Sequence, residues 1–513
     1  MKIKVTTKNI VAAFNKAAES RWAWLLLIPV TVVFLLFYSI STSPLFAFEG
    51  GDSAIFKEIG LACMHGKVPY RDIFDNKGPL LYWINGLGMS CCGRMGIFIL
   101  QILFQTVALL FLYKTARFFV CGTKSVLVLL LVLAFYSVFM LEGNQCEEWM
   151  LPIICVAFYI GTKYFANPDC GIKNREMVML GVCFSMAFFI RPNDAVGMIG
   201  GCVAGLAIHN AVKRQWCDLL RMIALEVVGM VLVTAPIVTY FVVNNAMSNL
   251  IYGMFGVNLE YTGGVAGLLR GYASDSGSWI LTAILTCTCI ALSATKMRSA
   301  LWIVIPCSVF ECILFGRSFY FHYYIVILPI YTVLFASVFA MQNKRLGVVA
   351  MLMALFMPLT YSYRLVPKKA AAQAVHQIRI LWGDYHYAYG DFLNISEEEV
   401  SNNMTAMHQL GSIIPNEERD SVWNCNLIEY RTCKNYFNYA FFAHNRIVQM
   451  NRMTFPLKEN MDIDPLNLST SPLWIVADPT RESVTDSIFS TRYDIVGSVS
   501  SFDGCVGLFK RKE

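Results

Sequence analysis

The chain has 513 residues, of which 56% are hydrophobic and only 15% are charged. A water-soluble protein of this length needs more charge to cover its surface, so the composition predicts a protein surrounded largely by lipid. The formal net charge of +6 is small, and no basic run with interleaved aromatic residues appears. These two features argue against a nucleic-acid-binding protein.

Apolar runs long enough to cross a bilayer as helices recur as far as residue 361. No cleavage site of small residues follows the first run, so we expect it to be retained as a helix. The sequence shows no internal repeat. We predict about eleven membrane spans, at residues 22–40, 96–112, 126–141, 149–165, 177–190, 195–211, 222–243, 279–294, 300–315, 323–341 and 346–361.

Lysines and arginines gather in alternate connections between these runs. With the N-terminus in the cytoplasm, every short basic connection falls on the cytoplasmic side, as the positive-inside rule requires. We therefore expect a multi-pass protein of the cell (inner) membrane. The basic connections carry Lys114, Arg117 and Lys124, then Lys173 and Arg175, then Lys213, Arg214 and Arg221, then Lys296 and Arg298, and then Lys344 and Arg345.

The polar C-terminal region follows an odd number of predicted spans and is therefore expected outside the cytoplasm. Its pattern predicts a helix within 396–410 and strands at 474–477 and 504–509. The predicted architecture is an α-helical polytopic membrane domain, 1–362, and a small extracytoplasmic α/β domain, 363–513. The first outer loop, 41–94, contains two short segments, 53–65 and 79–88, which we expect along the membrane interface.

Charged residues gather in the first outer loop. Asp52 follows two glycines at the start of a short helix, where an aspartate alone is most simply explained as an N-cap. The neighbouring charges of Arg71, Asp72, Asp75 and Lys77 favour a functional site instead.

Further polar residues stand at the outer ends of the spans. Glu147 and Glu148 begin the fourth span, where negative charge also suits a helix start. Arg191 ends the fifth span, and Arg317, His322 and Tyr323 join the ninth to the tenth. Arginine binds phosphate oxygens through two N–H groups, and histidine donates to phosphate or carries a proton. The aromatic residues here also fit an interfacial belt.

Carboxylates together with Arg and His suit transfer of a group from a lipid-linked phosphate. The cations would stabilise charge on the departing phosphate, and a carboxylate would take the proton of the acceptor as general base. Since nucleotide sugars are not available outside the cell, a polyprenyl-phosphate sugar is the expected donor.

The runs Gly51–Ser53 and Pro69–Tyr82 resemble bacterial membrane glycosyltransferases of the GT-C superfamily. These include relatives of the protein O-mannosyltransferases (glycosyltransferase family 39) and of the aminoarabinose–lipid A transferases. The segments at Glu147–Glu148, Arg191–Asn193 and Gly316–Tyr324 resemble the same group, in the same order along the chain.

This resemblance implies a GT-C-like membrane fold with Asp52 as the catalytic acid of the first outer loop. It places Glu147 or Glu148 as the second catalytic carboxylate. No cofactor is certain, although some members bind a divalent metal, so Mg²⁺ or Mn²⁺ stays an option. Donor-phosphate or substrate binding falls to Arg71, Asp72, Asp75, Lys77, Arg191, Arg317, His322 and Tyr323.

The main alternative is a transporter or flippase of a lipid-linked or small polar substrate. Transporters place their sites near the bilayer midplane, often in repeated halves, and here only Glu226 and Glu311 lie within apolar runs. Glu311 is expected either to have a functional role or to pair with Arg317 or His322. A structural assembly subunit would leave the first-loop charges unexplained. Sugar transfer on the non-cytoplasmic face, to a protein, lipid or glycan acceptor, is therefore the favoured interpretation.

Overall fold

The computed structural model describes most of residues 23–341 and several short segments of the C-terminal region. These residues fall into two compact units, each described by itself: unit 1 comprises 1–39, 99–237 and 262–372, and unit 2 comprises 40–98, 238–261 and 373–513. The predicted domain boundary at residue 362 lies outside the described residues and stays a prediction. The described ranges are 23–45, 52–140, 142–167, 171–262, 276–314, 321–341, 387–389, 393–395, 405–424, 441–442, 473–477, 479, 492–501 and 504–512.

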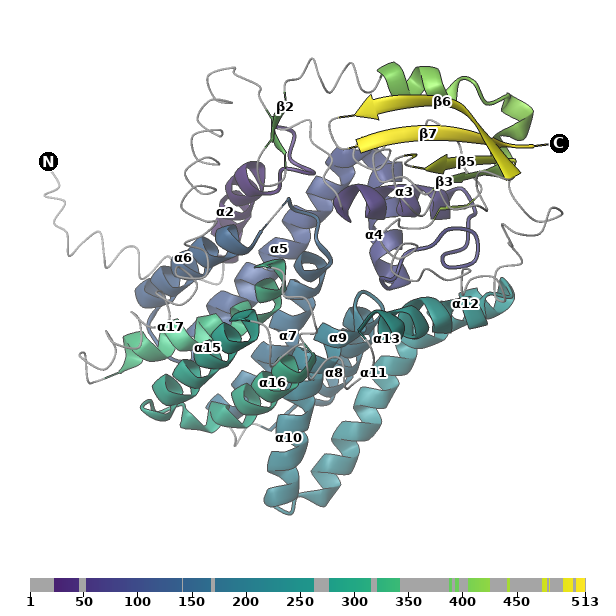
Figure 1. Cartoon of the computed structure of the whole chain (residues 1–513). Helices are drawn as coiled ribbons and strands as arrows, with labels where there is room; N and C mark the ends of the chain where they lie inside the picture. The colour runs from purple at the N-terminus through teal and green to yellow at the C-terminus, as the bar shows by residue number, and fades with distance from the viewer. Residues whose placement is uncertain are drawn as a thin grey trace, which may run out of the picture. The chain divides into compact units, whose positions relative to one another are not determined.

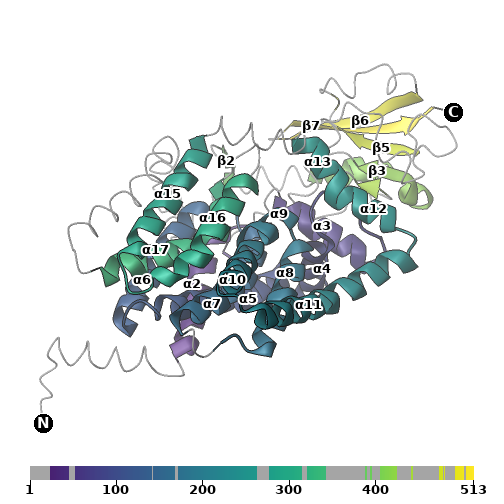
Figure 2. The ribbon, with the colours of Figure 1, turned by 90° about the horizontal axis from the view of Figure 1, so that it is seen from below.

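Unit 1 is a helical bundle in which α15 packs on α16 and α17, α17 packs on α6, and α10 packs on α16 (Figures 1 and 2). Helices α5 and α11 also extend into unit 2. The elements are α2 (Ala23–Tyr38), α5 (Arg94–Ala116), α6 (Gly122–Phe139), α7 (Cys146–Ala166), α8 (Asn174–Phe188), α9 (Pro192–Asp194), η2 (Ala195–Gly200), α10 (Gly201–Val212), α11 (Trp216–Val243), α15 (Ser276–Ser293), η4 (Arg298–Ala300), α16 (Leu301–Leu314), η5 (Phe321–Ile327) and α17 (Leu328–Ala340).

Every predicted span from 22–40 to 323–341 coincides with helix, which confirms a multi-pass membrane protein. Among the described residues, 6 helices are long and apolar enough to cross a membrane: 94–116, 122–139, 146–166, 192–212, 216–243 and 322–340. The last predicted span, 346–361, lies outside the described residues, so the span count stays a prediction.

Helix α11 shows why a lipid environment is needed. Along its length Leu220, Leu232 and Val243 expose 67%, 61% and 74% of their surface. A helix with so many large apolar side chains on its outside is stable in contact with lipid and unfavourable in water.

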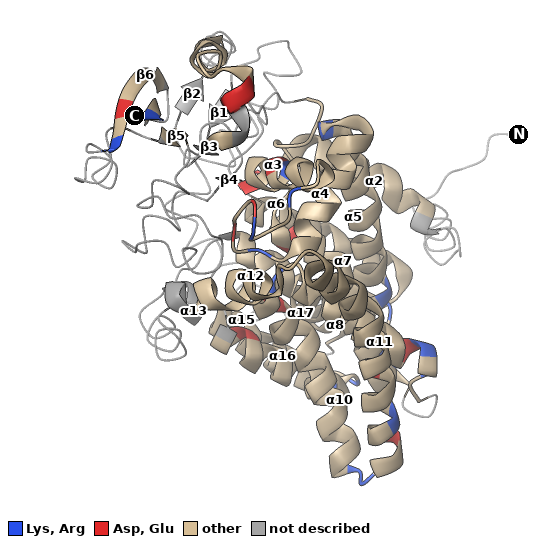
Figure 3. Cartoon of the chain, turned by 90° about the vertical axis from the view of Figure 1, so that its right-hand side faces the viewer, with Lys and Arg blue, Asp and Glu red and all other residues tan. Residues whose placement is uncertain are grey.

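The two ends of the bundle in unit 1 differ in charge. At the C-terminal end of α7, Lys163 Nζ lies 2.5 Å from Glu176 Oε1 at the start of α8. In the same place Ser299 Oγ, between α15 and α16, donates to the carbonyl of Phe165 at 3.0 Å. Basic connections that are far apart in the sequence therefore meet at one end. Figure 3 shows the turn between α10 and α11 in blue and the helices almost entirely tan.

Unit 2 contains the first outer loop. Its helices α3 (Asp52–Met64) and α4 (Pro79–Cys92) coincide with the two short segments identified there, and their place along the membrane interface stays a prediction. They pack so closely that a Cβ on Gly60 would lie 2.9 Å from Gly86 Cα, so glycine is needed at this crossing. The unit also contains α12 (Met247–Ile251), η3 (Tyr252–Gly256) and α13 (Val257–Thr262).

The C-terminal residues form a five-stranded sheet in the order β4-β3-β5-β7-β6 and a separate two-stranded pair, β1-β2. Strand β3 runs parallel to β4 and β5, whereas β7 runs antiparallel to β5 and β6. The central strands of this sheet carry buried apolar side chains, namely Val422, Ile475, Val476 and Leu508. The elements are β1 (Tyr387–Tyr389), β2 (Leu393–Ile395), η6 (Asn416–Ser421), β3 (Val422–Asn424), β4 (Phe441–Phe442), β5 (Trp474–Ala477), β6 (Tyr493–Ser501) and β7 (Gly504–Arg511).

Both predicted strands of the C-terminal domain are confirmed, because β5 covers 474–477 and β7 covers 504–509. The predicted helix within 396–410 is present from residue 405 onward, and its earlier part lies outside the described residues. The small α/β character expected of this region is therefore confirmed.

Candidate functional site

A tight turn sets the direction of α7, where both candidate glutamates lie. Gly143 and Asn144 have φ values of 84° and 59°, in the left-handed region. A Cβ on residue 143 would overlap Ser39, which explains the glycine. Asn144 Oδ1 accepts a hydrogen bond of 2.8 Å from Trp149 Nε1, which holds the turn against the helix.

Glu148 has a structural role at the start of α7. Its Oε1 accepts from the backbone N–H of Gln145 at 3.1 Å, as in a capping box. Its Oε2 accepts from Gln101 Nε2 on α5 at 3.1 Å, and its backbone carbonyl accepts from Gln105 Nε2 at 2.6 Å. Both carboxylate oxygens therefore have partners, and the bonds from Gln101 and Gln105 tie α7 to α5.

Glu147, on the other side of the helix start, faces cations. Its Oε1 forms an ion pair with Arg191 Nη1, and His322 Nε2 lies 3.8 Å from the same oxygen. The side chain is fully buried, and its Oε2 has no hydrogen-bond partner among the described residues. The neighbouring glutamates thus have different surroundings, and Glu147 is the one that contacts cations.

Arg191 reaches Glu147 because the chain breaks between α8 and α9. Its backbone is extended (φ −156°, ψ 109°), as expected before a proline, and Pro192 begins the next helix. The guanidinium carbon lies 4.0 Å from the ring centre of Tyr323, in a cation–π contact. Asp194 Oδ2 lies 3.3 Å from Arg191 Nη1.

The structure thus brings together Glu147, Arg191, His322 and Tyr323, four of the residues selected from the sequence. We call them the Glu147 cluster. They come from α7, the turn between α8 and α9, and η5, and they lie at the end of unit 1 opposite the basic connections. Asp194 was not selected from the sequence, although its spacing of three residues from Arg191 in a helix start would have indicated the pair.

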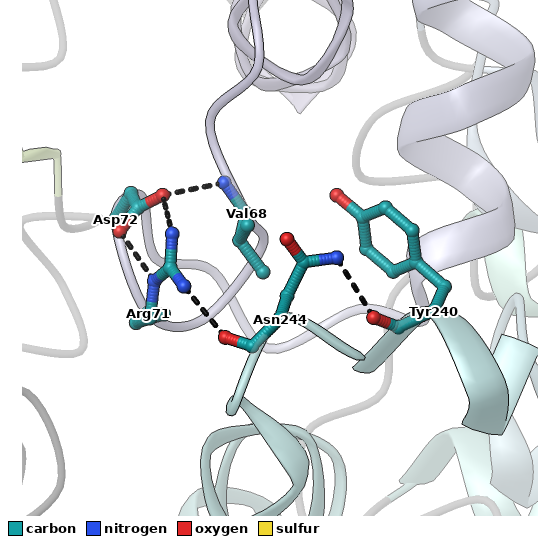
Figure 4. A network of polar contacts seen from close by, with 5 residues as sticks. All are labelled: Val68, Arg71, Asp72, Tyr240 and Asn244. Carbon is teal, nitrogen blue, oxygen red and sulfur yellow. Dashed lines mark hydrogen bonds and ion pairs between the residues drawn. The ribbon is translucent and has the colours of Figure 1, made fainter. Parts of the chain in front are cut away.

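The charged run of the first outer loop, in unit 2, is bonded mainly within itself. Arg71 contacts Asp72 through two bonds, Nε–Oδ1 and Nη2–Oδ2, each of 2.8 Å, and donates from Nη1 to the carbonyl of Asn244 at 2.6 Å (Figure 4). Asp72 Oδ2 accepts from the backbone N–H of Val68 at 2.7 Å. The hydrogen bond to Asp72 is the largest cause of the raised pKa of the Arg71 guanidinium. These contacts fix the loop to the end of α11.

A second network closes the same loop. Tyr82 donates from its hydroxyl to Asp75 Oδ2 at 2.9 Å and accepts from the backbone N–H of Lys77 at 3.0 Å. Burial, and then the Asp75 carboxylate, raise the pKa of the Tyr82 hydroxyl well above its ordinary value, which keeps it a donor. Lys77 Nζ donates to Asn76 Oδ1 at 2.8 Å. A substrate-binding role for Arg71, Asp72, Asp75 and Lys77 therefore stays a prediction, because loop folding accounts for these contacts.

Two further residues selected from the sequence complete the comparison. Asp52 is the first residue of α3 and is half-buried; it belongs to unit 2, whereas the Glu147 cluster belongs to unit 1. Arg317 lies outside the described residues. The sequence did not indicate buried Lys57, whose Nζ donates to the carbonyl of Ser41 at 2.6 Å, because a lysine in a short amphipathic helix is usually exposed.

The described part of the chain contains no cluster of three His, Cys, Asp or Glu side chains that could hold a metal ion. Glu147 is paired with the cationic Arg191 instead, and a carboxylate already neutralised in this way is a poor fit for Mg²⁺ or Mn²⁺.

Replacement of Arg191 by methionine should lower the free energy of unfolding by about 3–5 kcal/mol, because Glu147 would be left buried without its cation. The matched control is Lys163→Met, which breaks the more exposed pair with Glu176 and should cost about 1 kcal/mol or less. Denaturant titration of both variants in detergent measures the difference. Equal losses of unfolding free energy would show that the Glu147–Arg191 pair stabilises the protein no more than the more exposed Lys163–Glu176 pair does.

Replacement of Arg71 by lysine should lower the stability of the first outer loop, because an ammonium group cannot make the two parallel bonds to Asp72. We expect a loss of about 1 kcal/mol, since the pair is partly exposed. Arg175→Lys, at an exposed arginine, is the control. The apparent melting temperature and protease cleavage near the loop provide the measurement, and an unchanged loop would argue against its structural role.

Comparison with solved structures identifies the fold. The chain is similar to ArnT from Cupriavidus metallidurans bound to undecaprenyl phosphate, with a TM-score of 0.56 and 15% identity over 96% of this chain and 98% of that chain. The apo state of the same protein gives a TM-score of 0.56 and 13% identity over 95% and 98%. At this level of identity the match shows the fold alone, and that fold is GT-C, as the sequence motifs predict.

No curated protein sequence matches the chain. A family model does match, under the description Putative competence-induced protein Ccs4 N-terminal domain, and it covers residues 15–349. That range contains the whole helical bundle and the first outer loop, well over half of the chain. The chain therefore belongs to the competence-induced protein Ccs4 N-terminal domain family, and it has the GT-C fold.

Proposed function

We propose that this protein is a membrane glycosyltransferase that moves a sugar from a polyprenyl-phosphate donor to an acceptor on the non-cytoplasmic side of the cell membrane. The observation that carries the proposal is the buried Glu147 cluster at the bundle end opposite the basic connections. Under the positive-inside rule, the basic end faces the cytoplasm and the cluster faces the other side. The GT-C fold, shared with an ArnT that is bound to undecaprenyl phosphate, supports this choice of donor.

The donor phosphate would bind to Arg191 and His322. The Arg191 guanidinium has more N–H groups than its bonds to Glu147 and Asp194 use, and its cation–π contact with Tyr323 holds it in place. His322 adds a second N–H donor 3.8 Å from Glu147. Donors fixed before the reaction stabilise negative charge where it develops, here on the departing polyprenyl phosphate. Arg317 is proposed to bind the same phosphate, as the sequence resemblance implies.

The acceptor would lose its proton to Asp52, which acts as general base. In the balanced reaction, the acceptor oxygen or nitrogen forms a bond to the sugar C1, and the bond from C1 to the phosphate oxygen breaks. The electron pair of that bond leaves with the polyprenyl phosphate, and the acceptor proton goes to the carboxylate. Glu147 would keep Arg191 and His322 oriented while the phosphate binds.

The test is transfer from a radiolabelled polyprenyl-phosphate sugar in vesicles that contain the full chain. Glu147→Gln should reduce kcat by about 10²–10³-fold, because it removes the charge that orients the donor-binding cations. Glu148→Gln should change kcat by less than about threefold, since glutamine also serves at this position of a capping box. Equal losses in both variants would refute the division of roles between the two glutamates.

Asp52→Asn should lower kcat by about 10²–10⁴-fold, the usual effect of removing a general base. Asp218→Asn is the matched control, because Asp218 is also in the first turn of a helix but is exposed at the basic end. Unchanged transfer by Asp52→Asn would exclude Asp52 as the base. Movement of the lipid-linked sugar across the vesicle membrane, with no transfer by any variant, would favour the transporter alternative.

A further inference from the structure

Glu311 on α16 is a buried acid that the proposed reaction does not use. Its side chain is fully buried, and neither carboxylate oxygen has a hydrogen-bond partner among the described residues. An ionised carboxylate in such surroundings costs several kcal/mol. An ionisable side chain within a membrane helix is energetically unfavourable, so we expect this acid to have a function.

Gly197 provides the space that Glu311 occupies. A Cβ on residue 197 would lie 2.5 Å from the Glu311 carboxyl carbon and 3.0 Å from its Oε2. Gly197 belongs to η2, a π-helical turn at Ala195–Gly200, and such turns are frequent at functional sites. The acid therefore lies directly against the π-turn, in the contact between η2 and α16.

The π-turn connects Glu311 to the Glu147 cluster. It follows Asp194 directly in the chain, and Asp194 lies 3.3 Å from Arg191, which is paired with Glu147. Helix α16, which carries Glu311, also packs against α9, the short turn that contains Asp194. Among the described residues, Cys307 lies one turn before Glu311 on the same helix, and the Sγ of Cys202 on α10 lies 3.6 Å from that of Cys307.

Among the described residues, the charges in this region do not balance if every acid is ionised. Three carboxyl groups (Glu147, Asp194 and Glu311) lie there with one arginine and with His322, which is charged only when protonated. Buried like charges in one site cannot all be ionised. Glu147 and Asp194 each contact the guanidinium, whereas Glu311 makes no ion pair within the described residues. Glu311 is therefore the carboxyl group that remains protonated.

We propose that Glu311 is a positioning residue, held as a neutral acid against Gly197, which leaves the remaining N–H groups of Arg191 to the donor phosphate. When Glu311 ionises at higher pH, a third negative charge lies near Arg191 and repels the phosphate. Binding of a lipid phosphate is then strongest at low pH and weakens as the pH rises. This inference rests on the proposed function, in which Arg191 binds the donor phosphate.

The experiment compares the full chain with Glu311→Gln, which is a permanently neutral isostere. Undecaprenyl phosphate binding is measured in nanodiscs from about pH 5.5 to about pH 9. The two proteins should bind equally at low pH, and the variant should bind about tenfold more tightly at high pH. Titration of the lipid phosphate is the same for both proteins, so the ratio of the two affinities isolates Glu311.

Glu226→Gln is the matched control, because Glu226 is also a buried membrane acid, 3% exposed, but lies on α11. Its affinity ratio to the parent should stay at one at every pH. Gly197→Ala should weaken lipid binding at every pH, since the added methyl group displaces the Glu311 carboxyl group and disturbs the π-turn. If Gly197→Ala does not fold, Glu311→Gln still decides the matter.

Thermal stability across the same pH range separates this inference from the proposed function. A neutral buried acid makes the parent lose stability relative to Glu311→Gln as the pH rises above about 4.3, where a solvent-exposed glutamic acid ionises. If this loss of stability is observed but neither protein binds undecaprenyl phosphate, the proposed donor is wrong, whereas the conclusion that Glu311 is neutral still holds. The inference is overturned if the stability difference does not change with pH, or if Glu311→Gln binds lipid more weakly than the parent at every pH.

Discussion

The ion pair between Glu147 and Arg191 is the interaction on which the organisation of the bundle end depends. Both side chains are largely or wholly withdrawn from solvent, and a charge in that position needs an opposite charge beside it. The pair joins the start of α7 to the break between α8 and α9, and His322 adds η5 to the same point. One electrostatic requirement therefore holds together three segments that are far apart in the sequence.

The same requirement explains the difference between the two ends of the bundle. Lysines and arginines at the basic end can remain hydrated, and their pairs, such as Lys163 with Glu176, are partly exposed. At the other end the charged groups are buried and must satisfy one another, which fixes their geometry. Such fixed donors suit the proposed transfer from a lipid phosphate, since they need not reorganise during the reaction.

The charged run of the first outer loop has a different character. Arg71, Asp72, Asp75 and Lys77 carry much of the family resemblance, yet their contacts lie mainly with one another, with Tyr82 and with the end of α11. The residues of a recognisable sequence motif can therefore be needed to fold a loop as well as to bind a substrate. Asp52, the first residue of α3, is the residue proposed for the acceptor side.

The sequence alone determined the class of protein, the helical segments up to residue 341 and the alternation of basic connections, because these follow from local hydrophobicity and charge. It also selected Glu147, Arg191, His322 and Tyr323, although it could not separate Glu147 from Glu148. Only the tertiary structure shows that the two glutamates have different partners, since adjacent residues on a helix point about 100° apart. It likewise showed Glu311 against Gly197 rather than in a pair with His322, because contacts between separate helices depend on how the helices pack, which local patterns do not specify.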